Sequence, residues 1–212
     1  ARDAFQRALA CAPDHPDALN LYGVTLLQLG QPALALESLQ RAARLQRNNA
    51  GVLNNLAQAY FMVARYDEAL ATFQKASRLD PQQAQFTLGI ANCLALLGKL
   101  RDAEIQLRKL TDRFPQNALA WFNLGNVLRD QNRGNEALAC YRRTLELDPQ
   151  FADAHNNLAD VLHKLLRFED AEREYRACLA NAPGHLIARC NLASVVMDLG
   201  RFAEAEALCR EV

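Results

Sequence analysis

The chain has 212 residues, and 24 lysine and arginine side chains balance 24 aspartate and glutamate side chains, so its formal charge is zero. Nucleic-acid-binding proteins normally carry a basic surface, so this balance argues against a nucleic-acid partner. No apolar run approaches the roughly 20 residues that span a bilayer, and no signal peptide opens the chain, so we expect no membrane partner. The sequence starts without methionine, directly on a repeat, which suggests a fragment of a longer protein.

A period of 34 residues runs through the whole chain. One column is always alanine: Ala1, Ala35, Ala69, Ala103, Ala137, Ala171 and Ala205. A second column holds small residues: Gly23, Ala57, Ala91, Gly125, Ala159 and Ala193. A third holds large residues and ends in a smaller one: Phe5, Leu39, Phe73, Leu107, Tyr141, Tyr175 and Cys209. A fixed period without insertions predicts an array of stacked units, which is first of all a binding surface.

Each period contains two amphipathic helical patterns, as residues 118–151 illustrate. Trp121 and Leu128 fall on one face of the first helix, and a break follows at 130–134. The second helix ends before Pro149, because proline cannot donate the next backbone hydrogen bond. Small residues are expected to let the paired helices approach closely, and the large residues to fill the space between hairpins. In other periods the break contains a glycine that is expected to take a positive φ: Gly30, Gly98 and Gly200.

In chain order, this pattern predicts a single solenoid domain over 1–212. It begins with a terminal second helix (1–15) and ends with a partial unit (186–212). Between them lie five full units: 16–49, 50–83, 84–117, 118–151 and 152–185. One hairpin cannot bury its apolar face alone, so stability is expected from stacking of neighbours.

The six cysteines form no C-x-x-C pair, so the spacing suggests neither a zinc site nor a redox motif. Cys178 and Cys209 fall at predicted core positions, where cysteine acts as a small hydrophobe. A reduced, cytoplasmic setting fits this use best. We expect no metal and no cofactor.

These columns resemble the tetratricopeptide repeat, whose pattern is W-x₂-L-G-x₂-Y, then A-x₃-F, then P. Residues Trp121, Leu124, Gly125, Ala137 and Tyr141 follow it, and the resemblance covers the full chain. Departures are Arg47 in place of proline, and Leu19, Thr87, His155 and Arg189 in place of tryptophan. The resemblance implies an all-α, right-handed superhelix whose first helices line a concave groove that binds proteins or peptides.

In that family, the second, fifth, sixth, ninth, twelfth and thirteenth positions of each first helix face the groove. Transferred to 16–96, these positions are mostly apolar, with Phe61 and Met62 at the centre. From 119 onward they are polar and mildly acidic and include Phe122 and Asp160. The basic residues with which cochaperones clamp a C-terminal carboxylate are missing at the fifth and ninth positions, so an acidic chaperone tail is not the expected ligand.

Asparagine recurs at these groove positions. It occupies the sixth position in Asn55, Asn123, Asn157 and Asn191 and the ninth in Asn92 and Asn126. A side-chain amide both donates and accepts hydrogen bonds, so a ladder of amides could hold the backbone of an extended peptide. A similar ladder is known in the repeat arm of O-linked N-acetylglucosamine transferase, although Leu21 and Gly89 interrupt it here. The alternative is that these amides satisfy backbone groups at helix ends or between repeats.

No catalytic constellation is recognisable. His155 and His163 are eight residues apart, roughly 12 Å along a helix, which is too far to share a metal ion. We therefore expect a non-catalytic module that binds an extended peptide through the asparagines, with Phe61, Met62 and Phe122 as apolar anchors. A second hypothesis is the substrate-selecting arm of a larger enzyme, such as a glycosyltransferase of the kind just named. Self-association through uncapped ends is a third.

Overall fold

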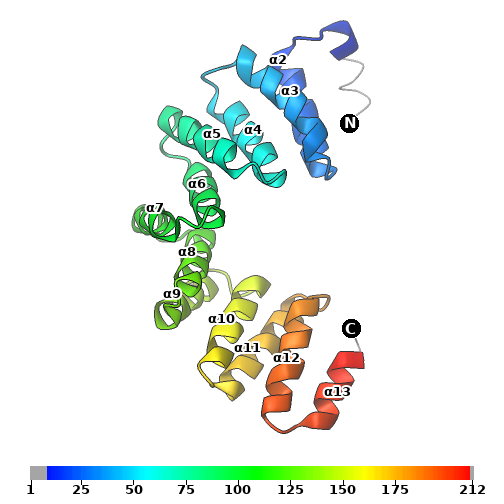
Figure 1. Ribbon diagram of the computed structural model, residues 1–212, viewed down its shortest axis with the longest axis vertical. Helices are drawn as coiled ribbons and strands as arrows, with labels where there is room; N and C mark the ends of the chain where they lie inside the picture. Colours follow the sequence, from blue (N-terminus) through cyan, green and yellow to red (C-terminus); the bar gives the residue numbers. More distant parts are fainter. Residues whose placement is uncertain (1–8, 211–212) are drawn as a thin grey trace. The chain divides into compact units, whose positions relative to one another are not determined.

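The computed structural model describes residues 9–210, which are helical apart from short turns (Figure 1). The helices alternate between two sets. The first helices are α2 (Pro16–Gln28), α4 (Ala50–Met62), α6 (Ala84–Leu96), α8 (Ala118–Asp130), α10 (Ala152–Lys164) and α12 (Leu186–Asp198). The second helices are α3 (Pro32–Leu45), α5 (Tyr66–Leu79), α7 (Leu100–Arg113), α9 (Gly134–Leu147), α11 (Phe168–Asn181) and α13 (Phe202–Arg210). Within each set, successive helices start 34 residues apart.

Part of the sequence lies outside the described range. The terminal second helix expected at 1–15 falls mainly there, together with Ala1 and Phe5, while residues 9–11 are helical. Residues 211 and 212 of the expected partial unit lie outside it as well. Within 9–210, no helix is both long enough and apolar enough to cross a membrane.

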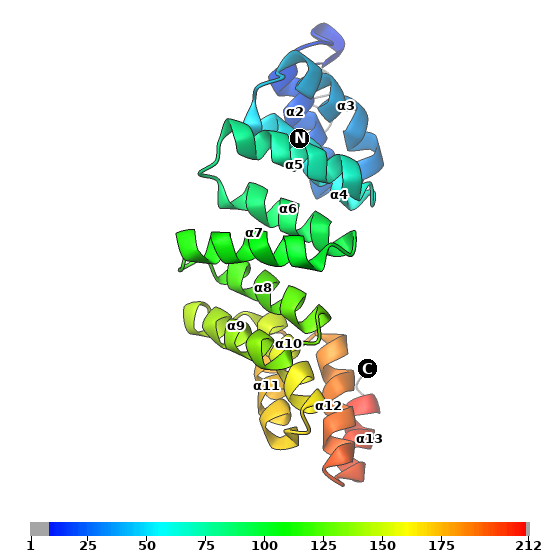
Figure 2. The same ribbon diagram turned by 60° about the vertical axis from the view of Figure 1, so that its left-hand side comes forward.

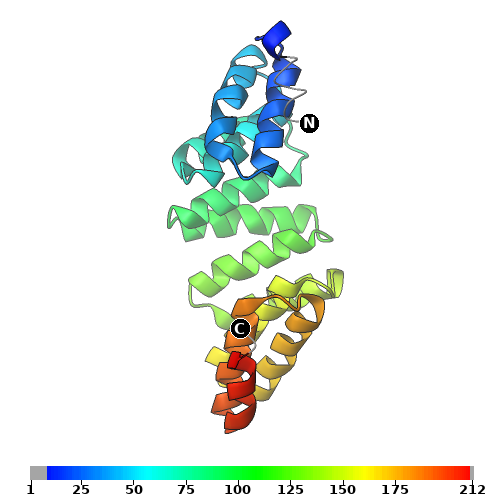
Figure 3. The ribbon, with the colours of Figure 1, turned by 90° about the vertical axis from the view of Figure 1, so that its right-hand side faces the viewer.

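The helices form two compact units, whose boundary falls inside α7 between Gln106 and Leu107. In the first unit, α2, α3, α4 and α5 each pack against the helix that follows in the chain, and α4 also contacts α2 and α6. The second unit repeats this order from α8 to α13, and α10 also contacts α8 and α12. Figures 2 and 3 show the antiparallel pairs in each unit, for example α2 with α3 (blue).

The small-residue column allows close helix packing. A Cβ atom added to Gly23 would lie 2.4 Å from Leu39 Cγ, and one added to Gly125 would lie 2.6 Å from Tyr141 Cε1. Non-bonded carbon atoms prefer a separation of about 3.5–4.0 Å, so no residue larger than glycine fits at these two positions unless the neighbouring side chain moves. The expected close approach of the paired helices is confirmed at both positions.

The large-residue column forms the core between hairpins, with one exception. Leu39, Leu107, Tyr141 and Tyr175 are fully buried. The prediction that Cys209 belongs to the core is wrong, because it is exposed on α13, which no further described helix covers.

The other predicted core cysteine behaves as expected. Cys178 is buried, and burial raises the pKa of its thiol to about 11. Cys93 is also buried, with a pKa raised to about 11 for the same reason. Thiols of this kind are largely protonated at neutral pH and therefore poor nucleophiles.

Side-chain caps fix where several first helices begin. A ring or amide acceptor stands at the N-cap and receives the backbone N–H three residues later. The pairs are His15 with Ala18 (3.3 Å), Asn49 with Val52 (3.2 Å), Asn117 with Ala120 (3.0 Å) and His185 with Ala188 (3.0 Å). Each of the two asparagine caps contributes about 1 kcal/mol to helix stability.

Candidate functional site

The second, fifth, sixth, ninth, twelfth and thirteenth positions of the first helices, which the family resemblance assigns to a groove, form a solvent-accessible surface on each unit. We call this surface the first-helix face. The opposite side of each first helix packs against second helices, as Leu124 and Leu128 of α8 do. On α2, α4, α6, α8, α10 and α12, only Asn54 and Leu88 are buried among these positions. Each unit therefore offers the remaining side chains to a partner.

The face of the first unit mixes apolar side chains with uncharged amides and is nearly free of charge. Three large side chains on different helices are about half exposed: Leu21 (48%), Met62 (50%) and Leu96 (55%). Phe61 is partly buried, and its ring meets Tyr66 edge-on at 5.5 Å. Asp17 is the one ionisable residue among these positions, and its carboxylate accepts a hydrogen bond from Gln46 at 2.9 Å.

A polar network joins three helices on the face of the second unit. Asn126 of α8 accepts two hydrogen bonds at its Oδ1 atom, from the Tyr141 hydroxyl of α9 (2.9 Å) and from Asn157 Nδ2 of α10 (2.8 Å). Asn156 in turn donates to Asn157 Oδ1 at 3.0 Å. Because the carbonyl oxygen of Asn126 is occupied twice, its NH₂ group is the part of this amide that remains for a partner.

The other asparagines are placed differently. Asn55 donates to Asn20 at 2.9 Å and so links α4 to α2. Asn92, Asn123 and Asn191 are partly buried on α6, α8 and α12. Some of these amides therefore connect neighbouring repeats, through other amides rather than through backbone groups, and all six remain partly accessible, so peptide binding by the series stays a prediction.

The interruption of the series at Gly89 has a steric cause. A Cβ atom there would lie 2.7 Å from the ring of Phe73, which comes from α5. No asparagine side chain fits unless that ring moves, so the first unit cannot continue the series at this position.

The remaining predicted residues of the second unit lie beside this network. Phe122 is partly buried, with its ring centre 4.8 Å from that of Phe151 and 6.0 Å from that of Tyr141. Asp160 is partly buried and pairs with Lys164 at 2.8 Å. His163 contacts Asp198 of α12 at 2.7 Å.

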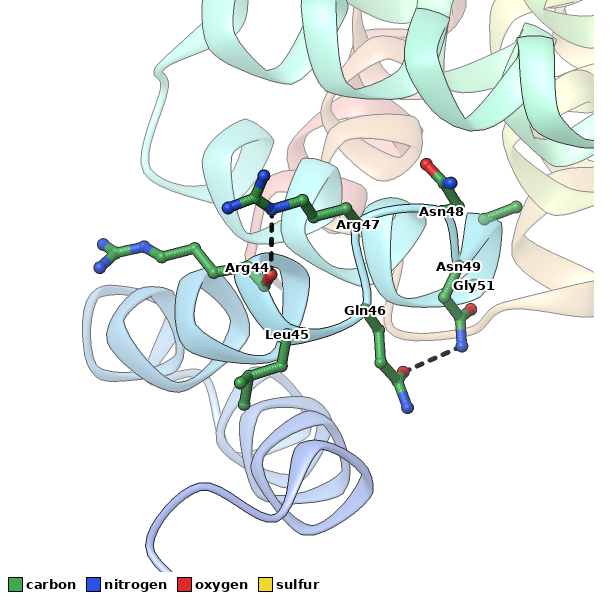
Figure 4. A pocket seen from close by; sticks show the side chains of 8 residues that line it. Arg44, Leu45, Gln46, Arg47, Asn48, Asn49 and Gly51 are labelled. Carbon is green, nitrogen blue, oxygen red and sulfur yellow. Dashed lines mark hydrogen bonds between the residues drawn. The ribbon is translucent and has the colours of Figure 1, made fainter.

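A hollow outside the first-helix face lies on the α3–α4 loop and is lined by residues 44–51 (Figure 4). Arg47, which replaces the recurring proline, donates to the carbonyl of Arg44 at 3.3 Å, and Asn49 donates to Gln46 at 3.0 Å. A similar hollow is lined by residues 113–118, the corresponding loop two periods later. A hollow of this kind therefore recurs at two corresponding loops of the repeat.

Metal binding has no geometric support in the part of the chain that the structure describes. There, no three His, Cys, Asp or Glu side chains are grouped so that they could hold an ion.

Comparisons with known families agree with the helical repeat. Two models described as tetratricopeptide repeat match residues 63–126 and 164–212, and one described as TPR repeat matches 125–165, so together they span 63–212. A model described as anaphase-promoting complex, cyclosome, subunit 3 matches 4–76. By sequence, the chain matches no curated protein.

Solved structures share the fold at low sequence identity. YrrB, described as a TPR protein with an unusual peptide-binding site, is 22% identical; the match covers 89% of this chain and 97% of YrrB, with a TM-score of 0.62. A thermophilic TPR protein from Thermus thermophilus is 21% identical over 86% of this chain and 99% of its own, with a TM-score of 0.73. The APC/C hetero-tetramer Cut9–Hcn1 gives 16% identity, coverage of 96% and 42%, and a TM-score of 0.81. The shared fold is an all-α solenoid of stacked helix–turn–helix units.

Proposed function

Because the chain belongs to the tetratricopeptide repeat family and is a protein-interaction module of that kind, we propose that it binds an extended polypeptide segment along its first-helix face. The observation that carries this proposal is the Asn126 amide. Its oxygen accepts from Tyr141 and Asn157, which leaves two N–H donors on a partly exposed surface. An extended peptide presents backbone carbonyl groups that such donors can bind whatever the sequence of the peptide.

Two further features support the same proposal. Asn123 is one helical turn before Asn126, on the same face of α8, and can add a second contact. On the first unit, the half-exposed Leu21, Met62 and Leu96 suit apolar side chains of a ligand. Peptide binding in the related fold of YrrB makes the proposal reasonable but does not supply its residues.

The test is the affinity of the whole chain for a set of unstructured peptides, measured by fluorescence anisotropy. Asn123→Ala combined with Asn126→Ala is expected to weaken binding about 10- to 30-fold across different peptide sequences, since each lost hydrogen bond contributes roughly 1 kcal/mol. The matched control is Asn135→Ala, which removes an exposed amide from the second helix α9.

The outcomes separate the alternatives. Equal weakening by the control would indicate a general loss of structure, which the melting temperatures of the variants would show. Binding that survives the double substitution would move the site to the second helices or to the loops. No binding by the wild-type chain to any peptide would reject the proposal.

A further inference from the structure

One hydrogen bond recurs in a single column although the residue that makes it changes. In each of three successive repeats, the side chain at the tryptophan position donates to the carbonyl oxygen of the proline six residues earlier. The bonds are Trp121 Nε1 to Pro115 O (3.0 Å), His155 Nε2 to Pro149 O (3.1 Å) and Arg189 to Pro183 O (2.6 Å). His155 and Arg189, which depart from the family pattern in sequence, thus keep the contact of the tryptophan.

His155 differs from the other two because its second ring nitrogen also faces an oxygen. Nδ1 lies 2.6 Å from Glu174 Oε2 on α11. A neutral imidazole has one N–H group and one lone pair, so it would direct that lone pair at one of the two oxygens. An imidazolium carries a proton on both nitrogens and satisfies both contacts.

The surroundings favour such a cation. The His155 side chain is 14% exposed and that of Glu174 is 29% exposed, so water screens their interaction only in part. Of the helices packed against α10, α11 supplies the charge that acts on the ring, from Glu174. The other carboxylates near α10 are paired with different bases: Asp160 with Lys164, Asp198 with His163, and Asp153 with His185.

We propose that His155 is held as an imidazolium that locks α10 to α11 and to the loop before α10, so that this repeat loosens when the proton is lost. Asn181 also donates to the Pro149 carbonyl, at 3.3 Å, so the lock reaches the end of α11. Loss of the proton leaves His155 with one of its two contacts.

The direction of the pH effect follows from linkage. The hydrogen bond to Glu174 raises the pKa of His155 above its ordinary 6.5, although burial opposes this. A group whose pKa is higher in the folded than in the unfolded chain stabilises the fold fully below the unfolded pKa, about 6.5. This contribution is lost as the pH rises through the folded pKa, so the lock opens toward alkaline pH.

Two other histidines use a ring nitrogen as an acceptor: His185 Nδ1 accepts the backbone N–H of Ala188 at 3.0 Å, and His15 Nδ1 accepts that of Ala18 at 3.3 Å. Several ionisable groups contribute to the pH dependence of stability, so the His155 contribution is measured as a difference between the wild type and a variant at this position.

The lock adjoins the candidate site, because α10 also carries Asn156 and Asn157. Control of peptide binding by pH rests on the proposed function, whereas the titration of His155 does not. The two can therefore fail independently.

The first measurement is NMR of the histidine ring nitrogens in the whole chain during a pH titration. We expect both nitrogens of His155 to be protonated at pH 6.5, and its pKa to fall in Glu174→Gln. Titration of His155 at or below 6.5 in the wild type, or an unchanged pKa in Glu174→Gln, would overturn the proposal.

The second measurement is the melting temperature between pH 6 and pH 9 for the wild type and for His155→Arg. Arginine keeps a permanent charge, and Arg189 makes the same proline contact in the next repeat. The wild type is expected to lose several degrees relative to His155→Arg as the pH rises, whereas parallel curves would contradict the lock. If His155→Arg does not fold, the NMR titrations of the wild type and Glu174→Gln still test whether His155 is held as an imidazolium.

Discussion

At the scale of single residues, the turns after the first helices show where this chain carries strain. The residue at one column takes a positive φ in every described repeat: Gly30 (69°), Ala64 (60°), Gly98 (74°), Asn132 (61°), Leu166 (58°) and Gly200 (77°). Glycine adopts this conformation freely and asparagine tolerates it, but alanine and leucine are strained there. The positive φ predicted for Gly30, Gly98 and Gly200 is confirmed, and Ala64 and Leu166 share it by their place in the 34-residue period although their residue types do not favour it.

Leu166→Gly is therefore expected to stabilise the chain. The substitution relieves the strain of about 1–2 kcal/mol that the left-handed conformation imposes on a leucine. The greater conformational freedom of glycine in the unfolded chain offsets part of this stabilisation. A net increase of about 1 kcal/mol in the free energy of unfolding is expected in urea denaturation. Leu166 is 73% exposed, so its removal costs little packing.

Gly200→Ala is the matched control, because it introduces the same strain in the next repeat and should destabilise the chain. A loss of stability in Leu166→Gly would show that Leu166 makes contacts that outweigh its backbone strain.

The alanine column provides a second residue-scale prediction. Ala137 is fully buried, with 0% of its surface exposed. Ala137→Leu forces additional methylene groups into this packed space and is expected to cost about 1–3 kcal/mol. Ala139→Leu adds the same atoms at an exposed position of α9 and is expected to change stability by less than about 0.5 kcal/mol. Equal melting temperatures for Ala137→Leu and the wild type would contradict this account of the column.

At the scale of helices, the tyrosines of the large-residue column test the polar network. The Tyr141 hydroxyl donates to Asn126, whereas the buried Tyr175 hydroxyl has no well-formed hydrogen bond and interacts only weakly with the Asn191 side chain. Tyr141→Phe is expected to cost about 1 kcal/mol in urea denaturation, while Tyr175→Phe is expected to be neutral or stabilising.

The same pair of variants separates stability from binding. Without its hydroxyl partner, the Asn126 amide keeps only the hydrogen bond from Asn157 and is held less firmly, so Tyr141→Phe is also expected to weaken peptide binding a few-fold. Similar stability losses in the two variants would contradict the different roles assigned to the two hydroxyl groups.

The helices were predictable from the sequence because the 34-residue period repeats both their apolar faces and their turn residues. The hydrogen-bond partners were not predictable. Nothing in the pattern indicates that Asn157 donates to Asn126, 31 residues earlier, or that His185 caps α12. Amide and imidazole groups can each bond in several ways, and small displacements of the helices decide among them. The sequence could therefore identify the surface that carries the candidate site but not the free donors on it.

At the scale of the whole molecule, charge decides what kind of partner the first-helix faces suit. The chain has no net charge, and each carboxylate on the face of the second unit has a bonding partner. Asp130 and Asp160 form ion pairs, whereas Asp153 and Asp198 contact histidines, which are charged only when protonated. The pairs are Asp130 with Arg129 (3.0 Å), Asp153 with His185 (3.3 Å), Asp160 with Lys164 (2.8 Å) and Asp198 with His163 (2.7 Å). A partner that depended on charge would first have to separate these groups.

Affinity for an uncharged peptide is therefore expected to change by less than about twofold between 50 and 500 mM salt, because the peptide offers no charge whose interaction with the protein salt could screen. Lys164→Ala is the informative variant, since it leaves the Asp160 carboxylate without its ion pair. This variant is expected to gain affinity for basic peptides at low salt and to lose that gain at high salt. A wild-type affinity that itself falls steeply with salt would mean that these pairs open to meet a charged partner, and the amides would then be secondary to the carboxylates in recognition.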